Sequence, residues 1–265
     1  MKASSALLVA VSCLVRLSGA GGTEKHDADE LAKQLANPVA ALISVPFQLN
    51  FDDYDSDAEK WLLNVQPVVP ITLNSKWNVI SRTILPVVDQ KDVVNDASQS
   101  GLGDTVQSFF FSPKAPTASG WILGLGPAAL LPTATDELLG QDQWALGPTA
   151  VALKQTESGW TYGALVNQLW SVAGANDRTD VNAMFLQPFL TKAVGHGQTI
   201  ALNAESTYDW QRDQWTIPIN LGYLKVSKLG SQLVSWQGGL RYYLETPDDG
   251  PDWGLRFTFT MLFPK

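Results

Sequence analysis

Residues 252–265 alternate between apolar and polar side chains. Leu255, Phe257, Phe259, Met261 and Phe263 fall on one face, and Arg256, Thr258 and Thr260 fall on the other. This period of two predicts a β-strand. Its wholly apolar face favours contact with lipid, and its length meets the roughly 9 to 11 residues that a transmembrane strand needs. Because hydrocarbon cannot satisfy an open sheet edge, such a strand requires a closed barrel.

The rest of the chain also divides into segments of strand length. Twelve are predicted: 41–51, 60–71, 76–88, 102–112, 120–132, 143–154, 159–171, 180–192, 198–209, 214–225, 232–245 and 253–263. Alternation is clear in most of them, whereas 159–171 and 180–192 are placed by length alone. The predicted fold class is therefore all-β: a closed antiparallel transmembrane β-barrel of about 12 strands with a short N-terminal helix.

Tryptophan recurs at the starts of these segments. The residues are Trp61, Trp77, Trp121, Trp144, Trp160, Trp215 and Trp253. A tryptophan ring is apolar while its N–H needs a polar partner, so tryptophans at strand ends suit the aromatic girdle at a membrane interface. The alternative is ordinary core tryptophan, which has no reason to gather at segment edges.

Loop lengths and charges give the barrel a predicted orientation. The longer connections 52–59, 89–101, 133–142, 172–179, 210–213 and 246–252 alternate with shorter turns. Most acidic residues lie in or beside the longer connections, and lysines gather near the shorter turns. Longer loops are typical of the cell-surface end of outer-membrane barrels, which places the shorter turns in the periplasm.

Several prolines fall inside the predicted strands. They are Pro46, Pro67, Pro70, Pro86, Pro127, Pro148, Pro188 and Pro218. Each removes a hydrogen bond from the strand ladder, so we expect bulges or kinks there.

The amino terminus reads as an export signal. Lys2 precedes the apolar run 6–15, and small residues follow at Ser18 and Ala20, which predicts a signal peptide over 1–20. Cys13, the only cysteine, lies inside that run, so the mature chain is expected to lack thiols. A membrane-anchoring helix is the alternative, but the run is too short for one.

Residues 21–40 form the second predicted region, and 41–265 form the barrel. Leu31 and Leu35 are four residues apart, and Pro38 ends the pattern, which predicts a short amphipathic helix. Two interpretations remain open for it: a plug in the barrel or a frayed periplasmic tail.

Composition excludes other classes of protein. After the signal no 18 consecutive residues are apolar, so helical membrane spans are not expected. The chain has 26 Asp and Glu against 18 Lys and Arg, and a nucleic-acid surface would need basic clusters instead.

The sequence also resembles a known family, through motifs spread over nearly the whole mature chain. These are Glu-Leu-Ala-Lys-Gln at 30–34, Ile-Ser-Val-Pro-Phe-Gln at 43–48, Gln-Pro-Val-Val-Pro at 66–70, Trp-Asn-Val-Ile-Ser-Arg-Thr-Ile-Leu-Pro at 77–86, Gly-Leu-Gly-Asp at 101–104, Leu-Pro-Thr-Ala-Thr-Asp at 131–136, Gly-Pro-Thr-Ala at 147–150, Gly-Trp-Thr-Tyr-Gly at 159–163, Ser-Thr-Tyr-Asp-Trp at 206–210 and Asp-Trp-Gly-Leu-Arg at 252–256. They resemble bacterial outer-membrane proteins named for meta-pathway phenol degradation and labelled transporters. The resemblance implies an outer-membrane β-barrel and names neither a substrate nor catalytic residues.

The inventory of reactive residues predicts no enzyme and no metal or other cofactor. His26 lies in the N-terminal region and His196 in a tight turn, and neither has a serine and an acid nearby in sequence. Without cysteines or paired histidines, zinc has no site. Asp52, Asp53 and Asp55 belong to a dense acidic loop that fits no calcium motif, so a solvated loop is expected.

Charged residues within the predicted strands are the candidate functional residues, because lipid contact is costly for them. The predicted lumen-lining residues are Arg82, Asp104, Lys154, Glu205, Arg241 and Arg256. The leading hypothesis is an outer-membrane channel for small solutes, among them aromatic or hydrophobic compounds, with membrane lipid and an unidentified solute as its partners. A non-conducting structural or surface-interaction barrel is the alternative, and a barrel enzyme is a distant third.

Overall fold

Strands dominate the computed structural model, which describes residues 28–54, 58–94 and 97–264. This part of the chain contains one helix and sixteen strands. The helix is α1 (Ala28–Leu35), and the strands are β1 (Ile43–Tyr54), β2 (Glu59–Val65), β3 (Val68–Thr72), β4 (Trp77–Val94), β5 (Ala97–Leu102), β6 (Thr105–Pro113), β7 (Trp121–Leu131), β8 (Gln143–Gln155), β9 (Trp160–Gly174), β10 (Asn182–Gly195), β11 (Gln198–Ala204), β12 (Ser206–Asp209), β13 (Gln214–Thr216), β14 (Pro218–Leu229), β15 (Gln232–Tyr243) and β16 (Pro251–Phe263). The predicted signal peptide and His26 lie outside the described residues.

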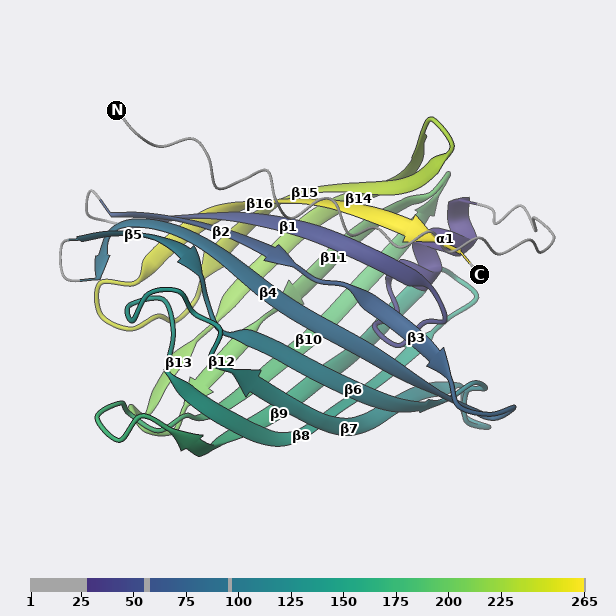
Figure 1. The fold of residues 1–265 in the computed structure, drawn as a ribbon. Coiled ribbons are helices and arrows are strands. Elements are labelled where there is room, and N and C mark those ends of the chain that lie inside the picture. The colour runs from purple at the N-terminus through teal and green to yellow at the C-terminus, as the bar shows by residue number, and fades with distance from the viewer. Residues whose placement is uncertain (1–27, 55–57, 95–96, 265) are drawn as a thin grey trace.

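The strands close into an antiparallel barrel (Figure 1). Four pairs of strands, β2 with β3, β5 with β6, β11 with β12 and β13 with β14, follow each other directly in sequence and continue one wall strand each, so the sixteen make twelve wall strands. The last strand, β16, pairs with the first, β1, from Ile43 with Phe263 onward, which leaves neither an open edge. The predicted closed antiparallel barrel of twelve strands is confirmed.

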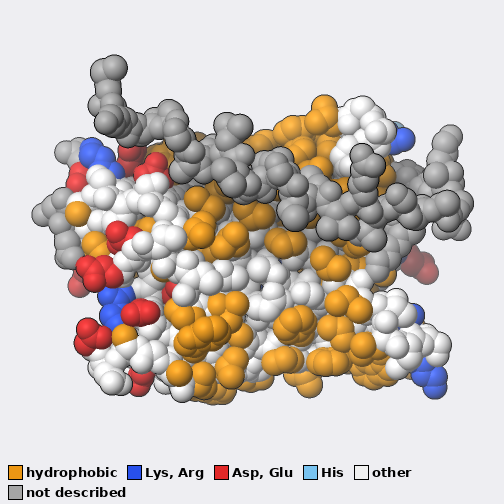
Figure 2. Space-filling model, in the orientation of Figure 1, with side chains coloured by type: hydrophobic (Ala, Val, Ile, Leu, Met, Phe, Trp, Pro, Cys, Tyr) orange, Lys and Arg blue, Asp and Glu red, His pale blue; other side chains and the backbone are white. Residues whose placement is uncertain are grey.

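Apolar side chains face outward from this barrel and polar ones face inward. On β16, Leu255 and Phe257 are 45% and 46% exposed, whereas Arg256 and Thr258 are 5% and 7% exposed. Figure 2 shows hydrophobic side chains across the middle of the visible face and acidic ones gathered at its left end. A water-soluble protein buries the opposite set, so this distribution suits a wall surrounded by lipid. Among the described residues, no helix is long and apolar enough to cross a membrane.

The two ends of the barrel differ. The connections β7–β8, β9–β10 and β15–β16 lie at one end, here called the loop end, and α1 lies at the other, here called the helix end (Figure 1). At the helix end β10 and β11 are joined by a tight turn in which Gly195, His196 and Gly197 all have positive φ angles of 89°, 56° and 70°. Glycine tolerates this backbone without strain, which permits so short a turn.

Two prolines interrupt the wall as predicted. The wall strand of β2 and β3 breaks at Gln66 and Pro67, and that of β13 and β14 breaks at Ile217 before Pro218. Opposite the second break, the Glu205 N–H donates to the Pro218 carbonyl oxygen at 3.2 Å, between β11 and β12. The other six prolines lie within strands that continue past them, although the ladders β6–β7 and β8–β9 lack pairs beside Pro127 and Pro148.

The N-terminal segment 28–42 enters the barrel from the helix end. On α1, Leu31 and Ala32 are buried against Val226 of β14 and Leu262 of β16. The chain then crosses the barrel, and Val39 packs in a cluster with residues of β4, β6, β8 and β9: Ile80, Phe110, Val151, Leu153 and Leu165. The predicted helix is therefore present, and its apolar residues contact the inside of the wall.

Candidate functional site

The most strongly charged contact inside the barrel joins Arg256 of β16 to Glu205. Arg256 Nη1 donates to Glu205 Oε1 at 2.8 Å and Nη2 donates to Oε2 at 2.7 Å, while Arg256 Nε donates to Asn50 Oδ1 at 2.7 Å. Both charged side chains are largely buried. A bidentate pair of this kind recovers much of the cost of removing both charges from water.

Two further hydrogen bonds of amide side chains lie in the same part of the interior. Gln187 Nε2 of β10 donates to Glu205 Oε1 at 3.4 Å, and Arg82 Nη2 of β4 donates to Gln66 Oε1 at 3.1 Å. We call the set Asn50, Gln66, Arg82, Gln187, Glu205 and Arg256 the polar belt. Its members come from β1, β4, β10 and β16, from the break before Pro67, and from the break between β11 and β12, where Glu205 is hydrogen-bonded to Pro218. The prolines therefore help to place Gln66 and Glu205 in the belt.

A second charged group lies nearer the loop end. Arg241 Nε of β15 is 3.5 Å from Asp52 Oδ1 of β1, and the Arg241 guanidinium lies 5.0 Å from the centre of the Tyr243 ring. Lys60 of β2 lies directly opposite Asp52 of β1 in the strand register, so the two side chains leave the sheet on the same face. Among the described residues of the wall strands and their breaks, the inward-facing charges named here are thus four cations, Lys60, Arg82, Arg241 and Arg256, and two acids, Asp52 and Glu205.

The interior is not completely filled. A cavity of about 190 Å³ lies between the N-terminal segment and the polar belt. Its lining includes Leu35, Pro38, Leu42, Arg82 and Gln187. We call this cavity the Arg82 chamber.

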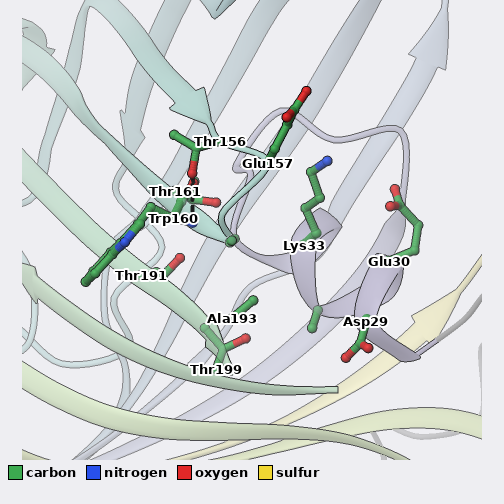
Figure 3. A pocket seen from close by; sticks show the side chains of 13 residues that line it. Asp29, Glu30, Lys33, Thr156, Glu157, Trp160, Thr161, Thr191, Ala193 and Thr199 are labelled. Carbon is green, nitrogen blue, oxygen red and sulfur yellow. Dashed lines mark hydrogen bonds between the residues drawn. The ribbon is translucent and has the colours of Figure 1, made fainter. Parts of the chain in front are cut away.

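A larger cavity of about 330 Å³ separates α1 from the turns of the helix end (Figure 3). Glu30 and Lys33 of α1 lie across it from Glu157 of the β8–β9 turn. The helix is tied to the wall around this cavity, because Gln155 Nε2 donates to the Lys33 carbonyl oxygen at 2.8 Å and Gly197 N–H donates to Asp29 Oδ1 at 2.5 Å. These bonds hold α1 within the mouth of the barrel.

Two of the predicted lumen-lining residues lie elsewhere. Asp104 lies between β5 and β6, and its carboxylate accepts hydrogen bonds from Ala134 N–H at 3.1 Å and Gln141 N–H at 2.6 Å. It therefore folds the β7–β8 connection and does not line the lumen. Lys154 shares its strand face with the exposed Trp144 and Leu146, so it points outward. Its position at the helix end of β8 allows the ammonium group to reach the polar edge of the apolar band.

The structure places the other four predicted residues, Arg82, Glu205, Arg241 and Arg256, inside the barrel. Several interior partners were missed by sequence reasoning: Asn50, Asp52, Lys60, Gln66 and Gln187. Asp52 was assigned to an acidic loop, although it continues the alternation of Ser44, Gln48 and Asn50 on β1. Extending that strand to Tyr54 would have found it.

The tryptophans that start the predicted segments lie near both ends of the wall. Trp61, Trp144, Trp215 and Trp253 are near the loop end, and Trp77, Trp121 and Trp160 are near the helix end. Five of the seven are exposed, and Trp121 and Trp215 are half-buried. This arrangement gives two bands of tryptophan separated by the apolar wall.

The histidine and the acidic residues of the described part of the chain do not form a metal site. His196 lies on the β10–β11 turn. Within residues 28–54, 58–94 and 97–264, no group of three or more His, Cys, Asp or Glu side chains is placed to hold a metal ion. Asp53, which was expected in an acidic loop, lies in β1 opposite Trp253 of β16.

Comparisons with known proteins identify a solved structure with a similar fold. No family model and no curated protein sequence matches the chain, so the phenol-degradation label is not confirmed. An outer membrane channel from Pseudomonas putida F1 has a similar structure, with a TM-score of 0.66 and 15% sequence identity over 84% of this chain and 94% of that one. Outer membrane phospholipase A from Escherichia coli aligns with a TM-score of 0.49 and 11% identity over 89% of this chain and 98% of that one. The chain shares the barrel fold of the first protein.

Proposed function

We propose that this protein is an outer-membrane channel through which small solutes, among them aromatic or hydrophobic compounds, pass along the barrel interior. Supporting this are the exposed apolar wall, which suits lipid, and the similarity of fold to an outer membrane channel. The observation that carries the proposal is an interior that combines buried charges with unfilled space, the Arg82 chamber beside the polar belt. A purely structural barrel can be filled by paired side chains and has no need of such a space.

The passage is narrow. The Arg256–Glu205 pair of the polar belt bridges two wall strands that are not neighbours, and the N-terminal segment also crosses the lumen. The same contacts favour the second candidate, a non-conducting envelope barrel. Conduction therefore depends on how far the segment and the belt leave a continuous path.

Charge inside such a passage governs which ions enter. In a poorly hydrated lumen the fields of Arg82 and Arg241 are screened less than at an open surface. The excess of interior cations over acids therefore favours anions, despite the acidic residues of the loop end.

The experiment is a planar-bilayer recording under a salt gradient. The wild-type protein should show small conductance steps with a reversal potential on the anion-selective side, and Arg241→Glu should shift that potential toward cations. Arg212→Glu, at an exposed residue of the β12–β13 connection, is the matched control and should shift it less. If the protein conducts and Arg241→Glu does not change the reversal potential, Arg241 does not line the conduction path. If the folded protein shows no conductance, the structural barrel is favoured.

A further inference from the structure

Arg82 forms no direct ion pair inside the barrel, and the carboxylate of Glu205 acts on it only at longer range. Both carboxylate oxygens of Glu205 accept hydrogen bonds from Arg256, at 2.8 and 2.7 Å. The bond that Arg82 Nη2 makes goes to the neutral Gln66 amide, at 3.1 Å. Among the described residues, no salt bridge includes Arg82. Since a guanidinium group has five N–H donors, Arg82 keeps donors for a ligand.

The space beside Arg82 is mainly apolar. Leu35, Pro38, Ala40, Leu42, Pro46 and Val68 line the chamber. Neutral polar groups also border it, from Gln34, Asn37, Ser44, Gln66 and Gln187. Arg82 is the one charged residue among the residues that line it. The chamber therefore presents one guanidinium group, that of Arg82, beside a mainly apolar lining.

We propose that the Arg82 chamber binds a small monocarboxylate, with the carboxylate on Arg82 and a short apolar body against the N-terminal segment. A planar carboxylate matches the fork of a guanidinium group and accepts two parallel hydrogen bonds from it. This inference rests on the proposed channel function and names a class of solute for it.

Size and charge narrow the class further. At about 190 Å³ the chamber is smaller than the roughly 300 to 1,000 Å³ of drug-sized pockets, which restricts the body to a few carbon atoms or one ring. A second negative charge on the ligand would have no free cation nearby, because Arg256 is already paired with Glu205. Dicarboxylates and phosphate esters are therefore disfavoured.

The test is isothermal titration calorimetry of benzoate against the purified mature protein in detergent micelles, with benzamide as the neutral analogue of the same shape. Benzoate should bind at one site per chain, and benzamide should bind at least about tenfold more weakly, because it cannot form the charge-assisted pair. Arg82→Gln should remove the preference for benzoate. Arg212→Gln changes an exposed arginine far from the chamber and should leave binding unchanged.

A second variant keeps the inference testable if Arg82→Gln does not fold. Ala40→Leu keeps Arg82 and reduces the apolar space, so it should weaken benzoate and benzamide alike. Gel migration before and after heating checks that each variant forms a barrel. Absence of saturable benzoate binding to the wild type, or equal binding by a folded Arg82→Gln, would overturn the inference.

Binding in micelles does not require conduction. A protein that binds benzoate but passes no current would refute the proposed channel alone. A protein that conducts but does not bind benzoate would refute the monocarboxylate site alone.

Discussion

Arg256 illustrates how a single residue depends on its surroundings. Its guanidinium is almost fully buried, and its bonds to Glu205 and Asn50 occupy three of its nitrogen atoms. Removing one member of such a pair leaves an uncompensated charge in a poorly solvated place. The contact is therefore expected to matter far more than an ion pair at the surface.

We predict that Glu205→Gln lowers the free energy of unfolding by about 3 to 5 kcal/mol, since breaking a buried pair strands the remaining charge. The double variant Glu205→Gln with Arg256→Gln should recover part of that loss. Urea unfolding followed by tryptophan fluorescence measures both. The matched control is Asp209→Asn, which weakens an ion pair to Arg212, 62% exposed, and should cost less than about 1 kcal/mol. A loss no larger in Glu205→Gln than in Asp209→Asn would contradict the role of the belt.

The cost of placing a charge in lipid was the reason for expecting all six charged candidates inside the barrel. It was right for Arg82, Arg241 and Arg256, which lie in long strands, and for Glu205, which lies at a strand break. It was wrong for Asp104, which lies in a strand break, and for Lys154, which shares the outward face of β8 with Trp144 and lies at the end of that strand. Gln66 and Gln187 lie on wall strands that neighbour those of Arg82 and Glu205, but matching them requires the register of each strand pair, which the sequence alone does not give.

At the scale of elements, β16 carries the clearest information. Its alternation, length and apolar face predicted its position in a closed wall, and its pairing with β1 and β15 bears out that position. The predicted strand count was also right, because turn residues separate the wall strands. The strand breaks at 66–67 and 217 could not be distinguished from the six uninterrupted prolines, since the difference lies in the pairing of neighbouring strands.

We predict that Phe257→Arg, on the exposed face near the middle of β16, destabilises the barrel in lipid by about 2 to 4 kcal/mol. The charge would lie in hydrocarbon, where it has no partner. The fraction of protein that migrates as folded barrel on unheated gels, after refolding into vesicles, measures the effect. Phe257→Leu should fold almost normally. Equal folding of the two variants would mean that this face does not contact lipid.

At the scale of the whole molecule, the two ends of the barrel predict its orientation. We expect an epitope tag inserted at Asp249, in the β15–β16 connection, to be reached by antibody on intact cells. A tag at His196, in the β10–β11 turn, should be reached only after the outer membrane is opened. Asp249 and His196 both have positive φ in tight turns at opposite ends, which makes the two insertions comparable. The reverse pattern would mean that the barrel is inverted.

The N-terminal segment crosses the lumen, and its helix and buried residues hold it against the wall. It therefore affects how easily a solute can pass through the barrel. Sequence alone left a plug and a tail as equal interpretations. Leu31 and Val39 now contact opposite parts of the interior wall, which favours a plug. A plug predicts that the segment limits conduction.

The most direct measurement is single-channel conductance in planar bilayers for the mature protein with and without residues 21–40. A channel narrowed by its N-terminal segment predicts small steps for the intact protein and clearly larger steps after the deletion, with both proteins showing the gel shift of a folded barrel. Silence from both folded proteins would contradict a channel.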